Sequence, residues 1–86
     1  MELSFENFGQ MMTGKVVSIR GMFAVVLADN PFGTKNLVLL TGDVEGTGWT
    51  AYRHGNDVVL GVLSMFANKY RECNKLASRV AKYLAS

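Results

Sequence analysis

A single apolar stripe runs through the last third of this chain and constrains its fold more than any other feature. Its members alternate in steps of four and three, as residues on one face of a continuous α-helix do: they are Val59, Leu63, Phe66, Tyr70, Cys73, Ala77, Val80 and Leu84. The stripe predicts one long amphipathic helix over residues 57–85. At 1.5 Å per residue such a helix is about 43 Å long. The rest of the chain, or a second molecule, has to cover its apolar face.

The start of this helix has two interpretations. Residues 58–63 contain three valines and a glycine, which suit a strand better than a helix. The stripe continues through the same residues, however, and Asn56 or Asp57 can cap a helix that begins there. We favour the helix.

Residues 14–54 differ in character from the C-terminal third. Four segments rich in β-branched and aromatic residues are separated by turn-forming residues; they are 15–20, 23–28, 36–40 and 49–53. The second segment is apolar at every position, which indicates a central strand buried on both faces. The short connections, at 29–34 and 41–48, favour an antiparallel meander.

The N-terminal segment, residues 1–13, also has two interpretations. Ser4 can cap a short helix over residues 4–12, in which Phe5, Phe8 and Met12 would share one face. A strand through Leu3 and Phe5 is the alternative.

The sequence therefore predicts an α+β fold in a single domain, residues 1–86, in which a meander of four or five antiparallel strands packs on one long C-terminal helix. Strands of about 20 Å, stacked about 4.8 Å apart, cover only part of a 43 Å helix. The uncovered end predicts a homodimer. Its interface would consist of Cys73, Leu76, Ala77, Val80, Tyr83 and Leu84.

Composition limits the setting in which the protein works. The single cysteine excludes an intramolecular disulfide, so we expect a reducing, cytoplasmic location. The N-terminus lacks the features of a signal peptide. Because the longest nearly apolar run, 58–67, is half the length of a membrane span, we expect no membrane association.

Charge is distributed unevenly along the chain. Residues 1–63 contain four basic and six acidic side chains, whereas residues 64–86 contain five basic and one acidic. The five C-terminal cations follow one side of the predicted helix: Lys69, Arg71, Lys75, Arg79 and Lys82. Such a ridge can bind an acidic protein surface or nucleic-acid phosphates, or simply be solvated. We favour the protein partner over nucleic acid.

No catalytic or cofactor motif stands out. The glycine-rich loop 42–48 lacks the Gly-Lys-Ser/Thr ending of a phosphate-binding loop. His54, the single histidine, could pair with Asp57 and with a serine hydroxyl or the Cys73 thiol, but nothing in the sequence fixes such a triad, and Cys73 lies on the apolar stripe. Zinc-ligand spacing is absent. We expect no enzyme activity, cofactor, metal or small-molecule substrate.

These observations predict a non-catalytic protein-interaction module that self-associates through its C-terminal helix. Phage and mobile-element accessory or inhibitor proteins are often of this kind. The alternative function is a nucleic-acid-binding domain that uses the basic face of the same helix.

Overall fold

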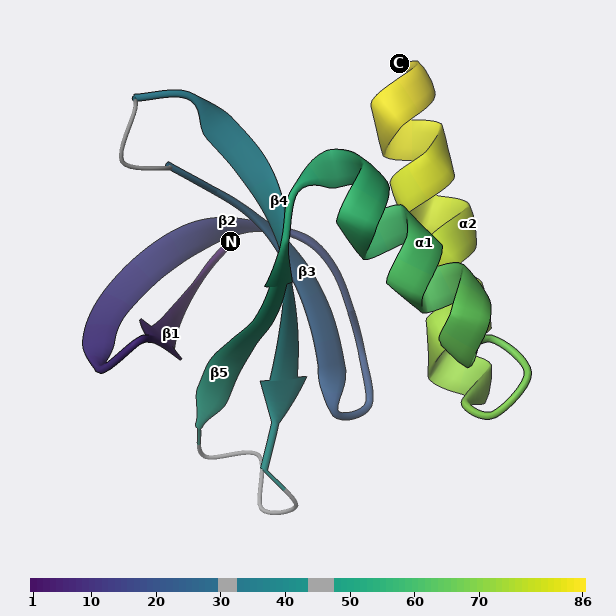
Figure 1. The fold of residues 1–86 in the computed structure, drawn as a ribbon, viewed down its shortest axis with the longest axis horizontal. Helices are drawn as coiled ribbons and strands as arrows, with labels where there is room; N and C mark the ends of the chain where they lie inside the picture. The colour runs from purple at the N-terminus through teal and green to yellow at the C-terminus, as the bar shows by residue number, and fades with distance from the viewer. Residues whose placement is uncertain (30–32, 44–47) are drawn as a thin grey trace.

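The computed structural model describes residues 1–29, 33–43 and 48–86, and these form five strands and two helices (Figure 1). In chain order the elements are β1 (Glu2–Asn7), β2 (Gln10–Arg20), β3 (Phe23–Asp29), β4 (Lys35–Gly42), β5 (Trp49–His54), α1 (Asn56–Phe66) and α2 (Arg71–Ala85). The strands close into a small barrel in that order, and both helices lie together on one side of it. The α+β class and the meander order are confirmed, but the sheet is a barrel and not an open layer.

The bend in β2 is what closes the barrel. Its first half pairs with β1, and its second half pairs with β3. A β-bulge between Val16 and Ser18 separates the two halves, and bulges bend a strand and increase its twist. The bent strand brings β1 round to β5, where Glu6 and Thr50 form a parallel bridge.

The short helix predicted over residues 4–12 is wrong, and the alternative strand through Leu3 and Phe5 is confirmed. Residues 2–20 form a hairpin whose two-residue turn is Phe8 and Gly9, both with positive φ, as a type I′ turn requires. Phe5 lies opposite Met12 across this hairpin. Two of the three apolar residues that suggested one helical face, Phe5 and Met12, therefore share one face of a sheet, and the third, Phe8, is in the turn.

The core has two layers, and β3 and β4 contribute to both. Six fully or almost fully buried side chains fill the barrel interior: Phe5, Ala24, Val26, Ala28, Val38 and Leu40. A second set lies between the barrel and the helices: Phe23, Val25, Leu37, Leu39, Val59, Leu63, Cys73, Leu76 and Val80. Successive side chains of a strand point to opposite faces. Strands buried on both faces are therefore apolar throughout, which confirms the central position predicted for β3.

The single helix predicted over residues 57–85 is also wrong. α1 ends at Phe66, whose carbonyl accepts hydrogen bonds from the backbone N–H groups of Lys69 and Tyr70. Tyr70 has an extended backbone, with φ −124° and ψ 118°, and α2 follows it. Because the chain turns back here, two shorter helices present their apolar faces to the barrel side by side (Figure 1).

The helical interpretation of residues 58–63 is confirmed, since they lie within α1. Its N-cap position is Gly55, and neither Asn56 nor Asp57 caps it. The Asn56 side-chain oxygen instead accepts a hydrogen bond from the Leu37 N–H, at 3.1 Å, and ties α1 to β4. Among the described residues, no helix is long and apolar enough to cross a membrane.

Candidate functional site

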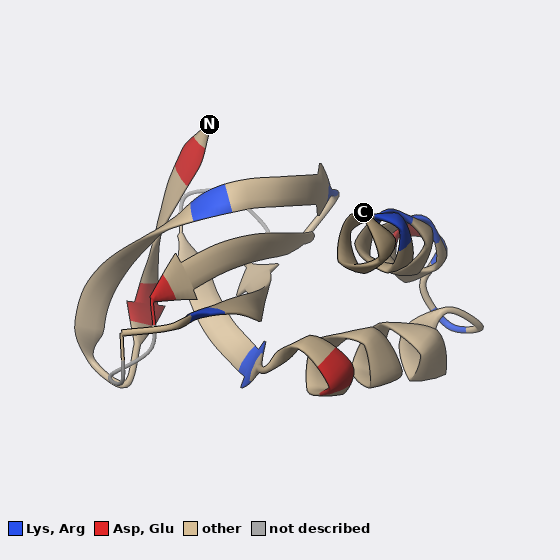
Figure 2. Ribbon diagram, turned by 90° about the horizontal axis from the view of Figure 1, so that it is seen from above, with Lys and Arg blue, Asp and Glu red and all other residues tan. Residues whose placement is uncertain are grey.

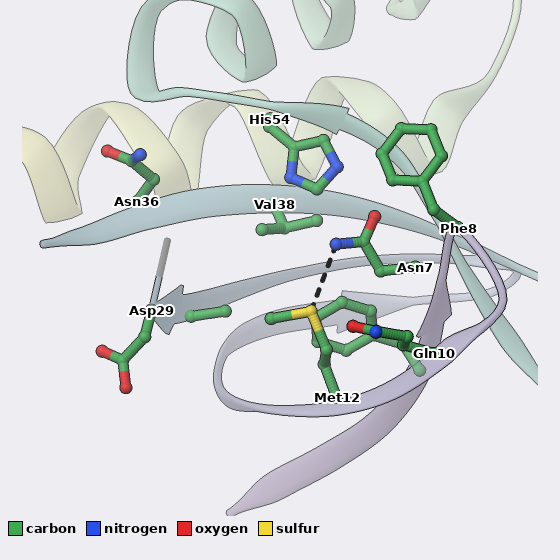
Figure 3. A pocket seen from close by; sticks show the side chains of 10 residues that line it. Asn7, Phe8, Gln10, Met12, Asp29, Asn36, Val38 and His54 are labelled. Atoms are coloured by element: carbon green, nitrogen blue, oxygen red, sulfur yellow. Dashed lines mark hydrogen bonds between the residues drawn. The ribbon is translucent and has the colours of Figure 1, made fainter. Parts of the chain in front are cut away.

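A pocket of about 590 Å³ opens at the end of the barrel that carries the β1–β2 turn (Figure 3). Its floor is apolar and belongs to the barrel core: Phe5 is 0% exposed, and Ala28 and Val38 are each 3% exposed. Met12 completes this floor. The rest of the lining is polar or aromatic and comes from all five strands and the β1–β2 turn: Asn7, Phe8, Gln10, Asp29, Asn36 and His54. An apolar cavity with a few polar groups at its edge is the usual form of a binding site.

Phe8 is the most unusual residue of this rim. Its side chain is 94% exposed, and its backbone has φ 52°, a region that bulky residues rarely adopt. The ring stacks loosely on His54, with 6.3 Å between centroids and 12° between planes. Neither burial nor backbone preference explains a phenylalanine here. Residues held in such conformations cluster at binding and active sites.

The polar rim consists mainly of amide side chains. The Asn7 side-chain nitrogen donates a hydrogen bond to the Met12 sulfur at 3.1 Å (Figure 3). This bond connects the rim of the pocket, at Asn7, to its floor, at Met12. Asn36 and Gln10 add two further amides. Asp29 supplies the acidic group of the lining and forms an ion pair with Lys35 at 3.0 Å. No lysine or arginine is among the residues described as lining the pocket.

Four of the five residues of the predicted basic ridge lie on α2, and Lys69 precedes this helix. Lys75, Arg79 and Lys82 line a shallow depression of about 230 Å³ on α2, together with Asn74 and Ser78. The sixth residue of this depression is Arg20, from the end of β2, which the sequence analysis did not connect with the ridge. We call these six residues the basic groove. Figure 2 shows the end of β2 beside the basic side of α2.

The other two residues of the predicted ridge lie apart from the groove. Lys69 is in the α1–α2 connection, where its ammonium group lies 5.5 Å from the centre of the Tyr70 ring. Arg71 is exposed at the first position of α2.

Most of the residues predicted to mediate self-association lie inside the protein's own core. Cys73, Leu76 and Val80 are 0% exposed, and Ala77 packs against the same cluster. Tyr83 and Leu84 are 41% and 37% exposed. The uncovered apolar stripe from which the homodimer was predicted is therefore largely covered by the barrel. The homodimer itself stays a prediction.

The groups considered for catalysis do not come together. His54 lines the barrel-end pocket, whereas Cys73 is buried between α2 and the barrel. Burial raises the pKa of the Cys73 thiol, and the neighbouring Glu72 carboxylate raises it further, so the thiol stays protonated. Within the described residues, no three His, Cys, Asp or Glu side chains gather where they could hold a metal ion. The predicted glycine-rich loop falls partly outside the described residues.

Sequence reasoning missed the pocket because it placed residues 4–12 in a helix. One local signal for the hairpin was present: Asn7-Phe8-Gly9 can form a tight turn, and apolar residues alternate before it at Leu3 and Phe5. Comparison with protein-family models, curated proteins and solved structures gave no match. The function proposed below therefore depends on the geometry of the chain itself.

Proposed function

We propose that this protein is a non-catalytic module that binds an extended segment of a protein partner in the barrel-end pocket. The observation that supports this most directly is the combination at the mouth of that pocket. A cavity with an apolar floor lies beside Phe8, a strained and almost fully exposed aromatic side chain. The partner would insert one apolar side chain and contact Phe8 with its neighbouring residues.

The cavity suits an anchor side chain. Binding energy at protein interfaces concentrates in a few aromatic or apolar side chains that enter pockets, and a rim of polar groups excludes water around them. Here the floor of Phe5 and Val38 is part of the packed barrel, so the pocket is pre-formed. A pre-formed pocket lowers the entropy lost on binding.

The rim suits a peptide more than an anion or a sugar phosphate. The side-chain amides of Asn7, Gln10 and Asn36 can each donate to a peptide carbonyl and accept from a peptide N–H. Asp29 is already paired with Lys35 at 3.0 Å, so the charges of the rim balance and an anionic ligand gains no net attraction there. A small module of this kind would act by occupying a site on another protein.

Peptide selection tests the proposal directly. A library of random peptides is selected for binding to the whole chain, and the affinities of the selected peptides are measured by fluorescence anisotropy. We expect peptides with an apolar or aromatic anchor side chain. Phe8→Ala should weaken their binding at least tenfold, since truncating an aromatic anchor costs about 2 kcal/mol or more.

Met65→Ala is the matched control, because Met65 is 74% exposed on α1 and does not line the pocket. It should leave the affinity unchanged. Chemical-shift mapping of the bound peptide should give changes at Asn7, Met12 and Asn36. Selected peptides that bind Phe8→Ala as tightly as the wild type, or that map to α1, would overturn the proposal.

A further inference from the structure

We infer that the basic groove between β2 and α2 binds the backbone phosphates of a nucleic acid. This site is separate from the barrel-end pocket: Gln10, at one end of β2, lines the pocket, and Arg20, at the other end, lines the groove. The inference therefore does not depend on the proposed peptide-binding function.

The cations of the groove are held by rigid elements. α2 is fixed on the barrel by Cys73, Leu76 and Val80, all fully buried, so its opposite face points outward in one orientation. Lys75 and Arg79 are four residues apart on that face, which places them about 6 Å apart along the helix axis. Arg20 adds a cation from a second element.

The cations of the groove form no ion pairs with the described residues. No carboxylate of the described residues forms an ion pair with Arg20, Lys75, Arg79 or Lys82. Glu72, the acidic residue of α2, lies beside the β2–β3 turn, with its side chain against Gly21. Four clustered cations repel one another, and an external anion relieves that repulsion.

The polarity of the groove favours nucleic acid over an acidic protein. Centres of protein–protein interfaces are apolar, whereas every side chain that lines the groove is charged or polar. Asn74 and Ser78 provide hydrogen-bond donors of the kind that contact phosphate oxygens. No aromatic side chain lines the groove, so base stacking is not expected, and the contacts would be independent of sequence.

The charge distribution of the whole molecule agrees with one-sided binding. The barrel carries both acidic and basic residues, whereas basic residues gather along one side of α2 (Figure 2). A polyanion would therefore be attracted most strongly to the α2 side of the molecule.

The test measures binding of a fluorescein-labelled 20-base-pair DNA duplex of arbitrary sequence to the full chain between 50 and 200 mM NaCl. Each phosphate neutralised contributes about −0.9 to the slope of log K against log [salt]. Four cations predict a slope of about −3.6, which is a loss of affinity of about 150-fold over this range. A second duplex of different sequence should bind equally well.

Arg20→Gln should reduce the magnitude of the slope by about 0.9. Lys15→Gln is the matched control, because it removes one charge from an exposed position of the same strand outside the groove. It should leave the slope close to that of the wild type. Phe8→Ala should not affect DNA binding.

Two results would overturn the inference. The first is an equal effect of Arg20→Gln and Lys15→Gln on the salt slope. This result would show that the net charge of the protein attracts the DNA and that the groove is not a binding site. The second is binding of poly-glutamate at least as tight as binding of the duplex at equal charge and salt, which would assign the groove to an acidic protein.

Discussion

The tip of the β1–β2 hairpin allows a test in which stability and binding change in opposite directions. Phe8 has φ 52°, a left-handed conformation that costs an ordinary L-residue roughly 1–2 kcal/mol. Asparagine tolerates this conformation, and Asn-Gly is the preferred pair for a two-residue hairpin turn. Phe8→Asn would create that pair with Gly9 and should remove most of the strain.

The Phe8 side chain makes few stabilising contacts that Phe8→Asn would remove. Because the Phe8 side chain is 94% exposed, its burial is worth only about 0.3 kcal/mol at ~25 cal/mol/Å². Its loose stacking on His54, at 6.3 Å, adds at most about 0.5 kcal/mol. The net expectation for Phe8→Asn is a gain of roughly 0.2–1.2 kcal/mol, which for a chain of this size raises Tm by roughly 1–8 °C.

Thermal unfolding followed by circular dichroism measures this shift in Tm. Phe8→Ala separates the effect of backbone strain from the effect of losing the aromatic ring. Alanine removes the same ring but keeps a β-carbon at positive φ, so its Tm should stay equal to or slightly below the wild-type value. Both variants should lose peptide binding. Equal Tm values for the Asn and Ala variants would refute the argument that Phe8 holds backbone strain for the sake of binding.

Two further predictions concern the helix layer. Val80→Asp should unfold the chain, because it places a charge at a position that is 0% exposed, at a cost above about 3 kcal/mol, whereas Ala81→Asp at an exposed position should stay folded. Circular dichroism and sedimentation together check this: a folded Val80→Asp protein that sediments as a smaller species than the wild type would place Val80 between copies and support the homodimer. The raised pKa of the Cys73 thiol makes folding stability depend on pH. The unfolded thiol ionises first, so this contribution is complete below the unfolded pKa and is lost as the pH rises through the folded pKa. The stability difference between wild type and Cys73→Ala in urea should therefore shrink from pH 7 to pH 10, and a constant difference would contradict the burial of the thiol.

The sequence predicted those parts of the fold that depend on short-range patterns. Alternation and turn residues identified the segments that became β3, β4, β5 and the second half of β2. The apolar character of residues 23–28 predicted a strand buried on both faces, and the two core layers show why. The pattern failed at residues 4–12, because Phe5 and Met12, seven residues apart, share one face both in a helix and across this hairpin.

The candidate sites were predicted less well than the elements. The charge pattern identified Lys75, Arg79 and Lys82, since a helical ridge is a local feature of the sequence. Arg20 joins them only because the barrel places the end of β2 beside α2. The barrel-end pocket combines residues from Phe5 to His54, and no local pattern connects them.

The sequence by itself determined the apolar stripe, and the structure retains its phase: Val59, Leu63, Cys73 and Val80 are all fully buried. The tertiary structure decided that the stripe is divided between two helices. Residues 67–70 contain no proline or glycine that would mark a break. Folding α2 back on the barrel beside α1 buries an apolar face that a straight helix would have left exposed. Burial of that face depends on the apolar side chains that β3 and β4 present to the helices, such as Val25 and Leu39, and these are distant in the sequence from the break.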